Sequence, residues 1–261
     1  MTTSTLTPTI VEALRGERLE RPIADLARAA GLRALLEDGI YDILGPTSPA
    51  APIVIRSSSL RQAPATADLS MSPLSRLRGV LVNQVLRLAS VGVTLEHPFA
   101  EVVSAWRLDA RGELLESFDR LDDEDRARLD ADLTAHAVTL RRALGEVPSG
   151  WMPRSAVRMS QRLAGGHVLL YDLDDLMVGT TSSVASVALL DVSTSPLGEG
   201  SERALRYHAL VQTLRASVAP LRVSTFSSAT GDLLTYDVDD DMLNRAANDV
   251  LGAVRNLWSH A

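Results

Sequence analysis

The sequence predicts an α/β (α+β) protein in which a mixed sheet is flanked by helices and a helical N-terminal half packs on it. In the first 150 residues, apolar side chains recur mainly at helical spacing. After that point they alternate as in strands, and 46% of the 261 residues are apolar, enough for a sizeable core. We find no linker or internal repeat, so we expect 1–261 to form a single domain: 1–150 mainly helical, 151–261 containing the sheet.

The N-terminal half shows three helical stretches and one short apolar run. The expected helices cover 10–44, 73–90 and a segment after Leu121, and the short strand covers 53–56. Pro73 suits the first turn of the second helix, with Ser72 as its N-cap. Asp122 can cap the third helix, and the polar segment 57–72 is expected to be a loop.

The C-terminal part alternates strands with two helices. The expected strands are 156–163, 167–178, 183–192, 221–227 and 233–238, and the expected helices are 199–217 and 240–258. A Gly165-Gly166 pair between the first two strands indicates a tight hairpin turn. The third strand is apolar almost throughout, which favours a central position in the sheet.

Composition excludes several function classes. All 26 basic residues are Arg, so a Walker A phosphate loop and Schiff-base chemistry are both impossible. The absence of Cys excludes disulfides and thiolate metal sites, and fits a cytoplasmic protein. The net charge of -7 argues against a broadly basic nucleic-acid coat, although a local Arg patch can still bind phosphate. No apolar run reaches about 18 residues, so we expect no membrane contact.

Two acidic segments lie at neighbouring strand ends. They are Tyr171-Asp-Leu-Asp-Asp-Leu-Met-Val-Gly179 and Leu190-Asp-Val-Ser-Thr-Ser195. Two carboxylates from such positions can hold Mg²⁺, which prefers oxygen ligands, lowers the pKa of a bound water and neutralises charge on a phosphate. The same acids, Asp172, Asp174, Asp175 and Asp191, also suit turns and strand ends that bind nothing.

The order of these elements resembles the restriction-endonuclease-like core of the PD-(D/E)XK nuclease superfamily, and its RecB-type branch most of all, including uncharacterised actinobacterial members. That branch carries GxxDLVxG and, further on, (D/E)xK(T/S)G. The similarity covers roughly residues 70–235. It implies that Asp175 and Asp191 are catalytic carboxylates and the metal ligands, binding Mg²⁺ weakly, and that Ser193 occupies the position of the catalytic lysine.

Further positions depart from the branch. Asn83 stands where the first core helix often carries a His, and the Gln-x-x-x-Tyr of the later helix is replaced by Ala204 and His208, or by Arg203 and Tyr207 one residue earlier. These losses, together with Ser193, favour a nuclease-like protein that has lost its catalytic activity.

Three functions follow. The first is a catalytically degenerate module that binds DNA or RNA through Arg203, Arg206, Tyr207 and His208, or binds a protein partner. The second is an active Mg²⁺-dependent nuclease in which Arg203 or Arg206 replaces the lysine, since Arg stabilises phosphate charge but cannot act as a base. The third is a purely protein-binding subunit.

Overall fold

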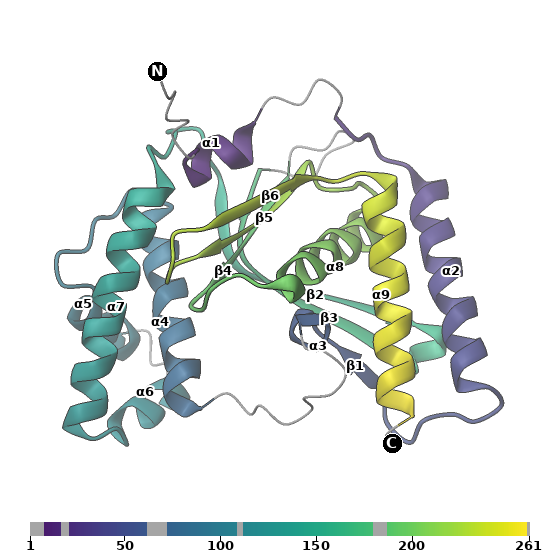
Figure 1. Cartoon of the computed structure of the whole chain (residues 1–261), viewed down its shortest axis with the longest axis horizontal. Helices are drawn as coiled ribbons and strands as arrows, with labels where there is room; N and C mark the ends of the chain where they lie inside the picture. The colour runs from purple at the N-terminus through teal and green to yellow at the C-terminus, as the bar shows by residue number, and fades with distance from the viewer. Residues whose placement is uncertain (1–7, 17–20, 62–71, 109–111, 180–186, 260–261) are drawn as a thin grey trace.

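The computed structural model describes residues 8–16, 21–61, 72–108, 112–179 and 187–259. A six-stranded mixed sheet lies between two groups of helices (Figure 1), which confirms the predicted fold class. The strands are β1 (Ile53–Ile55), β2 (Pro153–Leu163), β3 (Val168–Val178), β4 (Ala188–Ser193), β5 (Arg222–Ser227) and β6 (Leu233–Asp237). The helices are α1 (Ile10–Arg15), α2 (Leu26–Leu44), α3 (Ser57–Arg61), α4 (Pro73–Ala89), α5 (Pro98–Leu108), α6 (Gly112–Asp119), α7 (Asp123–Leu144), α8 (Glu199–Ala216) and α9 (Asp240–Trp258).

Strand β3 organises the sheet. It pairs with antiparallel β2 along its length, with parallel β1 near its start and with antiparallel β4 near its end. Strand β4 pairs in parallel with β5, which pairs with antiparallel β6. Because β1 comes from the N-terminal half of the chain, the two halves of the sequence share one sheet.

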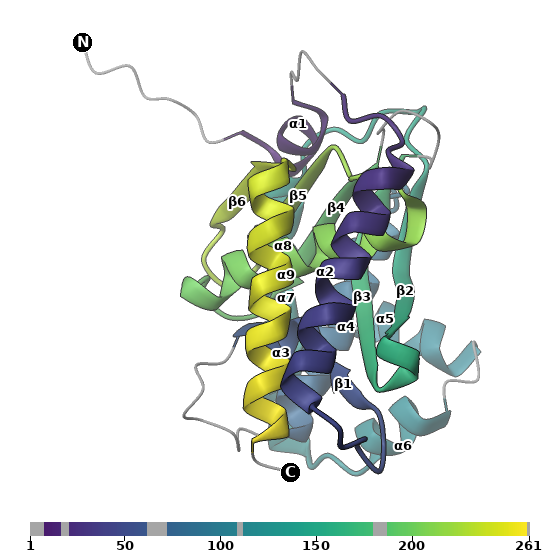
Figure 2. The ribbon, with the colours of Figure 1, turned by 90° about the vertical axis from the view of Figure 1, so that its right-hand side faces the viewer.

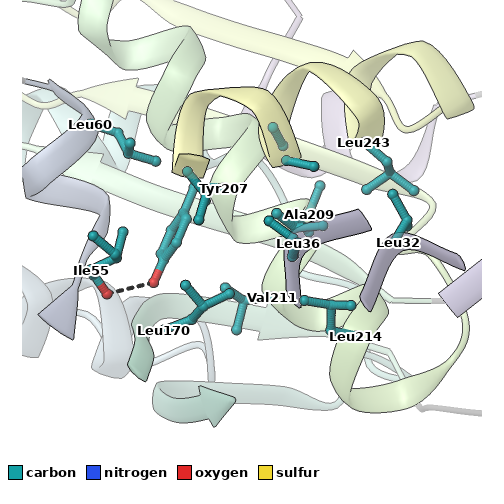
Figure 3. Packing of buried hydrophobic residues seen from close by; sticks show 14 of the residues in the cluster. Leu32, Leu36, Ile55, Leu60, Leu170, Tyr207, Ala209, Val211, Leu214 and Leu243 are labelled. Carbon is teal, nitrogen blue, oxygen red and sulfur yellow. Dashed lines mark hydrogen bonds between the residues drawn. The ribbon is translucent and has the colours of Figure 1, made fainter. Parts of the chain in front are cut away.

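Each face of the sheet has its own hydrophobic core. Helices α2, α8 and α9 cover one face, and α2 and α9 lie side by side there (Figure 2). Tyr207 and Leu36 are fully buried in this core (Figure 3). Helices α1, α4, α5 and α7 cover the other face, around Leu133 and Trp106. Both cores combine residues from before and after position 150, so neither half is packed without the other.

The predicted helix starts are confirmed at two positions. The Ser72 side chain accepts a hydrogen bond from the Ser75 N–H at the start of α4, and Asp122 accepts one from the Asp125 N–H at the start of α7. The strands β1, β2, β3, β5 and β6 and the helices α8 and α9 also match the predicted segments closely.

Other local predictions were wrong. The expected helix 10–44 is two helices, because α1 ends at Gly16 and α2 starts afresh with Asp25 as its N-cap. The start of the expected loop 57–72 is helix α3, and residues 62–71 lie outside the described residues, as does the first part of the expected strand 183–192. Helices α5 and α6 were not predicted. In the described residues, no helix combines the length and apolar character needed to cross a membrane.

Candidate functional site

Strand β3 carries Asp172, Asp174 and Asp175. The strand turns over locally, so that side chains before and after the turn-over alternate out of step, and this buries both Asp174 and Asp175. Leu170 packs in the core under α8, whereas Leu176 packs in the opposite core. Residues of equal parity share a face in a regular strand, so β3 turns over between these positions. The reversal coincides with a gap in the β2–β3 ladder opposite Asp175, where Ala156 has a positive φ of 51°. The consecutive residues Asp174 and Asp175 are therefore both buried.

Both carboxylate oxygens of Asp175 accept hydrogen bonds from the protein. Asn83 Nδ2, on α4, donates to Oδ1 at 2.6 Å, and the backbone N–H of Val192 donates to Oδ2 at 2.7 Å. The antiparallel register of β3 and β4 places Asp175 beside Asp191. Burial, together with the charge of Asp191, raises the pKa of Asp175 to about 8. Asp175 is thus a protonated group at neutral pH.

Asp191, at the end of β4, forms an ion pair with Arg61 of α3. The Arg61 Nη2 contacts Asp191 Oδ2, and Thr225 Oγ1 donates to the same oxygen at 3.3 Å. Burial alone would raise the pKa of Asp191, but the charges of Arg61 and His208 outweigh it and lower the pKa below that of an ordinary aspartate. Asp191 is therefore a carboxylate with a counter-cation supplied by the protein.

The first turn of α8 holds α3 in the position from which Arg61 reaches Asp191. A Cβ atom at Gly200 would overlap the backbone of Arg61, so glycine lets the two helices approach closely. Beside it, Arg203 Nε donates to the carbonyl oxygen of Leu60 at 2.9 Å. Residues 200–203 thus fix the end of α3, from which Arg61 reaches Asp191.

His208, on α8, lies against Asp172 and Asp174 of β3. Its Nδ1 is 2.9 Å from Asp172 Oδ2 and 3.1 Å from Asp174 Oδ1, and its Nε2 is 4.0 Å from Asp191 Oδ1. Asp172 and Asp174 are each 1% exposed, and His208 is 2% exposed. Asp174 Oδ2 and His208 Nε2 are buried with no hydrogen-bond partner among the described residues. These three side chains are close enough to hold a metal ion.

Charge coupling shifts the pKa values in this cluster. Burial alone would lower the pKa of His208, but the charges of Asp172 and Asp174 and their hydrogen bonds raise the pKa well above that of an ordinary histidine. Burial raises the pKa of Asp174 to about 6, although His208 pulls it in the opposite direction. At neutral pH, His208 is therefore a cation held between two aspartates.

Ser193, the residue at the expected lysine position, takes part in a turn. Its Oγ donates to the carbonyl of Ser195 at 2.9 Å and accepts the N–H of the same residue at 3.1 Å. In the described residues, its hydroxyl therefore contacts this turn and not Asp175 or Asp191.

The four residues expected to contact nucleic acid do not form a surface patch. Arg203 is bonded to α3 as above, and Arg206 pairs with Asp249 at 2.9 Å. Tyr207 is fully buried, and its hydroxyl hydrogen is shared between the carbonyls of Ile55 at 2.8 Å (Figure 3) and Tyr171 at 2.9 Å, while burial raises its pKa. His208 is equally inaccessible. A helical face that looked suitable for phosphate in the sequence is thus a packed interface.

Arg61 and the linkage of Asp172 and Asp174 to His208 were missed from the sequence. Arg61 is far from Asp191 along the chain and lies in a segment expected to be a loop, so no local pattern joined them. The Asp-x-Asp spacing of Asp172 and Asp174 was a usable signal, because residues two apart point to the same face of a strand.

No family model and no curated protein matches this chain. Among solved structures, the crystal structure of SSO0001 matches it over 84% of this chain and 84% of that chain, with 10% sequence identity and a TM-score of 0.33. A similarity this distant has no bearing on the chemistry of the site.

Proposed function

We propose that this protein is a nuclease-like module that binds nucleic acid without cleaving it. The observation that carries the proposal is that the two expected metal ligands, Asp175 and Asp191, are already bound by other groups of the protein. Asp175 has a protein donor at each oxygen, and Asp191 is paired with Arg61. A Mg²⁺ ion needs free carboxylate oxygens in nearly ideal octahedral geometry. It would have to compete with these donors, and above all with the Arg61 cation on Asp191, so this pair is a poor site for the ion.

The residue at the lysine position adds to this argument. Ser193 has no charge, and the sequence contains no lysine that could replace it. Loss of one group that stabilises transition-state charge commonly costs about 2.7–4 kcal/mol in the barrier. The two expected metal ligands are therefore engaged by protein groups, and the residue at the lysine position supplies no cation.

A binding surface is available on the outer side of the β2–β3 hairpin. Arg158 and Arg162 of β2 are exposed and, within the described part of the chain, form no ion pair. The register places them on the same side of the sheet as Tyr171, whose ring lies 5.5 Å from the Arg56 guanidinium. We call Arg56, Arg158, Arg162 and Tyr171 the arginine face. Cations beside a partly exposed aromatic ring are the features that bind a phosphate backbone and stack on bases.

The arginine face favours nucleic acid over a protein partner, because unpaired arginines on an acidic protein suit a polyanion. One contact favours a different function. Arg61 places a permanent positive charge beside Asp191, as an Arg-assisted Mg²⁺ nuclease would require. In that case Arg61, and not Arg203 or Arg206, would replace the lysine.

Cleavage assays separate these two functions. We expect the parent protein to leave single- and double-stranded DNA and RNA intact at physiological Mg²⁺. A Ser193→Lys variant assayed beside it tests whether the absent cation alone prevents cleavage. Cleavage by the parent that disappears in Asp175→Asn would overturn the proposal and establish the Arg-assisted enzyme.

Binding assays test the nucleic-acid partner. We expect fluorescence anisotropy to show affinity for labelled oligonucleotides that falls with salt, and that falls strongly in an Arg158→Ala/Arg162→Ala variant. The salt slope should decrease by about 0.7 for each phosphate that is no longer neutralised on a single strand, or about 0.9 on a duplex. The control is Arg141→Ala/Arg142→Ala, which removes two exposed charges on α7. Equal loss of affinity in both variants, or no binding by the parent at low salt, would contradict the arginine face and favour a protein-binding subunit.

A further inference from the structure

The buried groups around His208 include two polar atoms that the hydrogen bonds of the described residues leave without a partner. A single Nδ1 faces two carboxylate oxygens, at 2.9 Å and 3.1 Å, yet it carries at most one hydrogen. Asp174 Oδ2 and His208 Nε2 are buried without a hydrogen-bond partner in the described residues. Unpartnered polar atoms in the interior are costly, and native proteins have few of them.

We infer that Asp172, Asp174 and His208 form a binding site for one divalent transition-metal ion, with Asp191 orienting the imidazole. This site is distinct from the Asp175–Asp191 pair, and it goes beyond nucleic-acid binding, which does not require it. The ligand atoms are Asp172 Oδ2, Asp174 Oδ1 and His208 Nδ1.

The spacing of the ligand atoms suits a coordinated ion. At metal–ligand distances of about 2.1 Å, neighbouring ligands lie roughly 3.0 Å apart in an octahedral shell and roughly 3.4 Å apart in a tetrahedral one. The 2.9 Å and 3.1 Å separations around His208 Nδ1 are close to the octahedral value. An ion in this position would replace the proton on His208 Nδ1, which is released to solvent, and would bind both carboxylates through one centre, with Asp174 Oδ2 free to join as a second oxygen of the same carboxylate.

The ion would also give His208 Nε2 a role. A histidine that binds a metal through one ring nitrogen carries its hydrogen on the other, and usually donates it to a carboxylate that fixes the ring. His208 Nε2 lies 4.0 Å from Asp191 Oδ1, and a small movement of either side chain would form that bond. Arg61 in turn holds the other oxygen of Asp191.

The donor set indicates the class of ion. One imidazole nitrogen with two carboxylates suits Zn²⁺, Mn²⁺, Fe²⁺ or Co²⁺, whereas Mg²⁺ and Ca²⁺ prefer oxygen ligands only. The sequence has no Cys, so no thiolate competes for a soft ion. Because the three ligands are almost completely buried, we expect the ion to be taken up as the chain folds.

Cobalt provides a direct test. Full-length protein is unfolded, stripped with a chelator and refolded with Co²⁺ as the probe. We expect one bound ion per chain, visible absorption bands from nitrogen and oxygen ligands, and their loss when Zn²⁺ is added. Asp174→Asn and His208→Gln should abolish these bands. Asp191→Asn should weaken Co²⁺ binding on the order of 10–100-fold, as expected for a group that orients a ligand.

The matched controls are His97→Gln and Asp232→Asn, which remove an exposed histidine and an exposed aspartate. Both should bind Co²⁺ like the parent. A parent protein that binds no Co²⁺ after refolding would overturn the site, as would unchanged binding in His208→Gln.

If the variants of the proposed ligands fail to fold, spectra of the parent protein still test the metal site. Ring ¹⁵N spectra of the Zn²⁺-loaded protein should show one histidine bound through Nδ1, and zinc distributed over several exposed histidines would contradict the site. Oligonucleotide binding measured in chelator tests the proposed function separately, so the two proposals can fail independently.

Discussion

Asp175 and Asp174 are adjacent on β3, but their surroundings differ. Asp175 and its neighbour Asp191 together accept hydrogen bonds from a side-chain amide, a backbone N–H, a hydroxyl and a guanidinium. Asp174 and Asp172 share one imidazole nitrogen. The other oxygen of Asp172 accepts the Leu173 N–H at 3.0 Å, whereas the other oxygen of Asp174 is buried with no hydrogen-bond partner in the described residues. Asp175 and Asp191 therefore have several protein donors, including a cation of their own, whereas Asp172 and Asp174 share His208 as one counter-cation.

This difference indicates where the capacity for binding lies. A carboxylate that already has protein donors, and in the case of Asp191 a protein cation, gains less from binding a metal ion than one that lacks them. Asp174 has an unsatisfied oxygen, and an ion that replaces the His208 Nδ1 proton could coordinate both acids while His208 stays in the site as a ligand. The pair that the nuclease resemblance pointed to is therefore the less suitable metal site, and the pair beside it is the better one.

The largest change in the free energy of unfolding should come from removing His208, the cation that Asp172 and Asp174 share. In chelator-treated protein at neutral pH, we expect His208→Leu to lower the free energy of unfolding by about 3–5 kcal/mol, because Asp172 and Asp174 would remain buried without a counter-charge. Urea denaturation measures this change.

The control for that substitution is His136→Leu. His136 is also buried, on α7 in the opposite core, but the described residues place no acid against it. Its replacement should cost far less. Similar destabilisation of the two variants would show that His208 acts by filling space and not by its charge.

Much of the fold could be predicted from the sequence because its signals are local. The Ser72 and Asp122 caps act within one turn of helix, and strand alternation is a property of neighbouring residues. Gly16 was not recognised as a helix end, because apolar residues follow it at intervals that also fit a helix. The missed helices α5 and α6 are short and carry no N-cap signal that we used.

The candidate site was harder to predict because its contacts join distant segments. The order of the strands in the sequence predicted that Asp175 and Asp191 lie on neighbouring strands, and the β3–β4 register places them beside each other. The partners of these acids come from α3, α4 and α8, and no spacing in the sequence indicates that Arg61 will meet Asp191. The direction of each side chain also depends on the reversal of β3 opposite Ala156, a positive-φ residue that nothing in the sequence marks.

Stability should fall as pH rises from 6 to 8. Folded Asp175 keeps its proton up to a pKa of about 8, whereas an aspartate in the unfolded chain loses it near pH 4. Unfolding in this window therefore releases a proton, which costs the folded state about 1.4 kcal/mol per pH unit, or about 2–3 kcal/mol over the range. The pKa of His208 is also raised in the folded state, so above its unfolded pKa of about 6.5 it too lowers the free energy of unfolding as pH rises.

Urea denaturation of chelator-treated protein at several pH values measures this slope. Asp175→Asn should make the slope shallower, leaving only the contribution of His208, because asparagine has no proton to release, while the exposed-site variant Asp232→Asn should keep the parent slope. A parent whose stability rises between pH 6 and 8 would contradict the protonated state of Asp175.

Breaking the Arg61–Asp191 pair should have a moderate effect. We expect Arg61→Ala to cost about 1–2 kcal/mol of unfolding free energy, less than a fully buried pair, because the Arg61 side chain is 31% exposed and water can replace part of the interaction. A double-mutant cycle with Asp191→Asn isolates the pairwise term. Additive effects in the cycle would mean that the two side chains do not stabilise one another.

The smallest effect should come from the hydroxyl of Tyr207. Tyr207→Phe keeps the ring that packs between α8 and the sheet, but removes the O–H that donates to the carbonyls of Ile55 and Tyr171. We expect a decrease of about 0.5–1.5 kcal/mol in unfolding free energy, the usual value of one hydrogen bond.

The matched control for the hydroxyl is Tyr236→Phe, whose O–H donates to Glu202 in an exposed hydrogen bond where water can take its place. That change should cost less than Tyr207→Phe. Because Tyr207 adjoins His208 on α8 but bonds to β1 and β3, removal of its hydroxyl should leave Co²⁺ binding intact. A Tyr207→Phe protein that keeps its stability but loses the cobalt bands would show that the hydroxyl positions His208. The difference between the two acid pairs would then depend on how Tyr207 holds α8 to the sheet, as well as on the donors of the acids themselves.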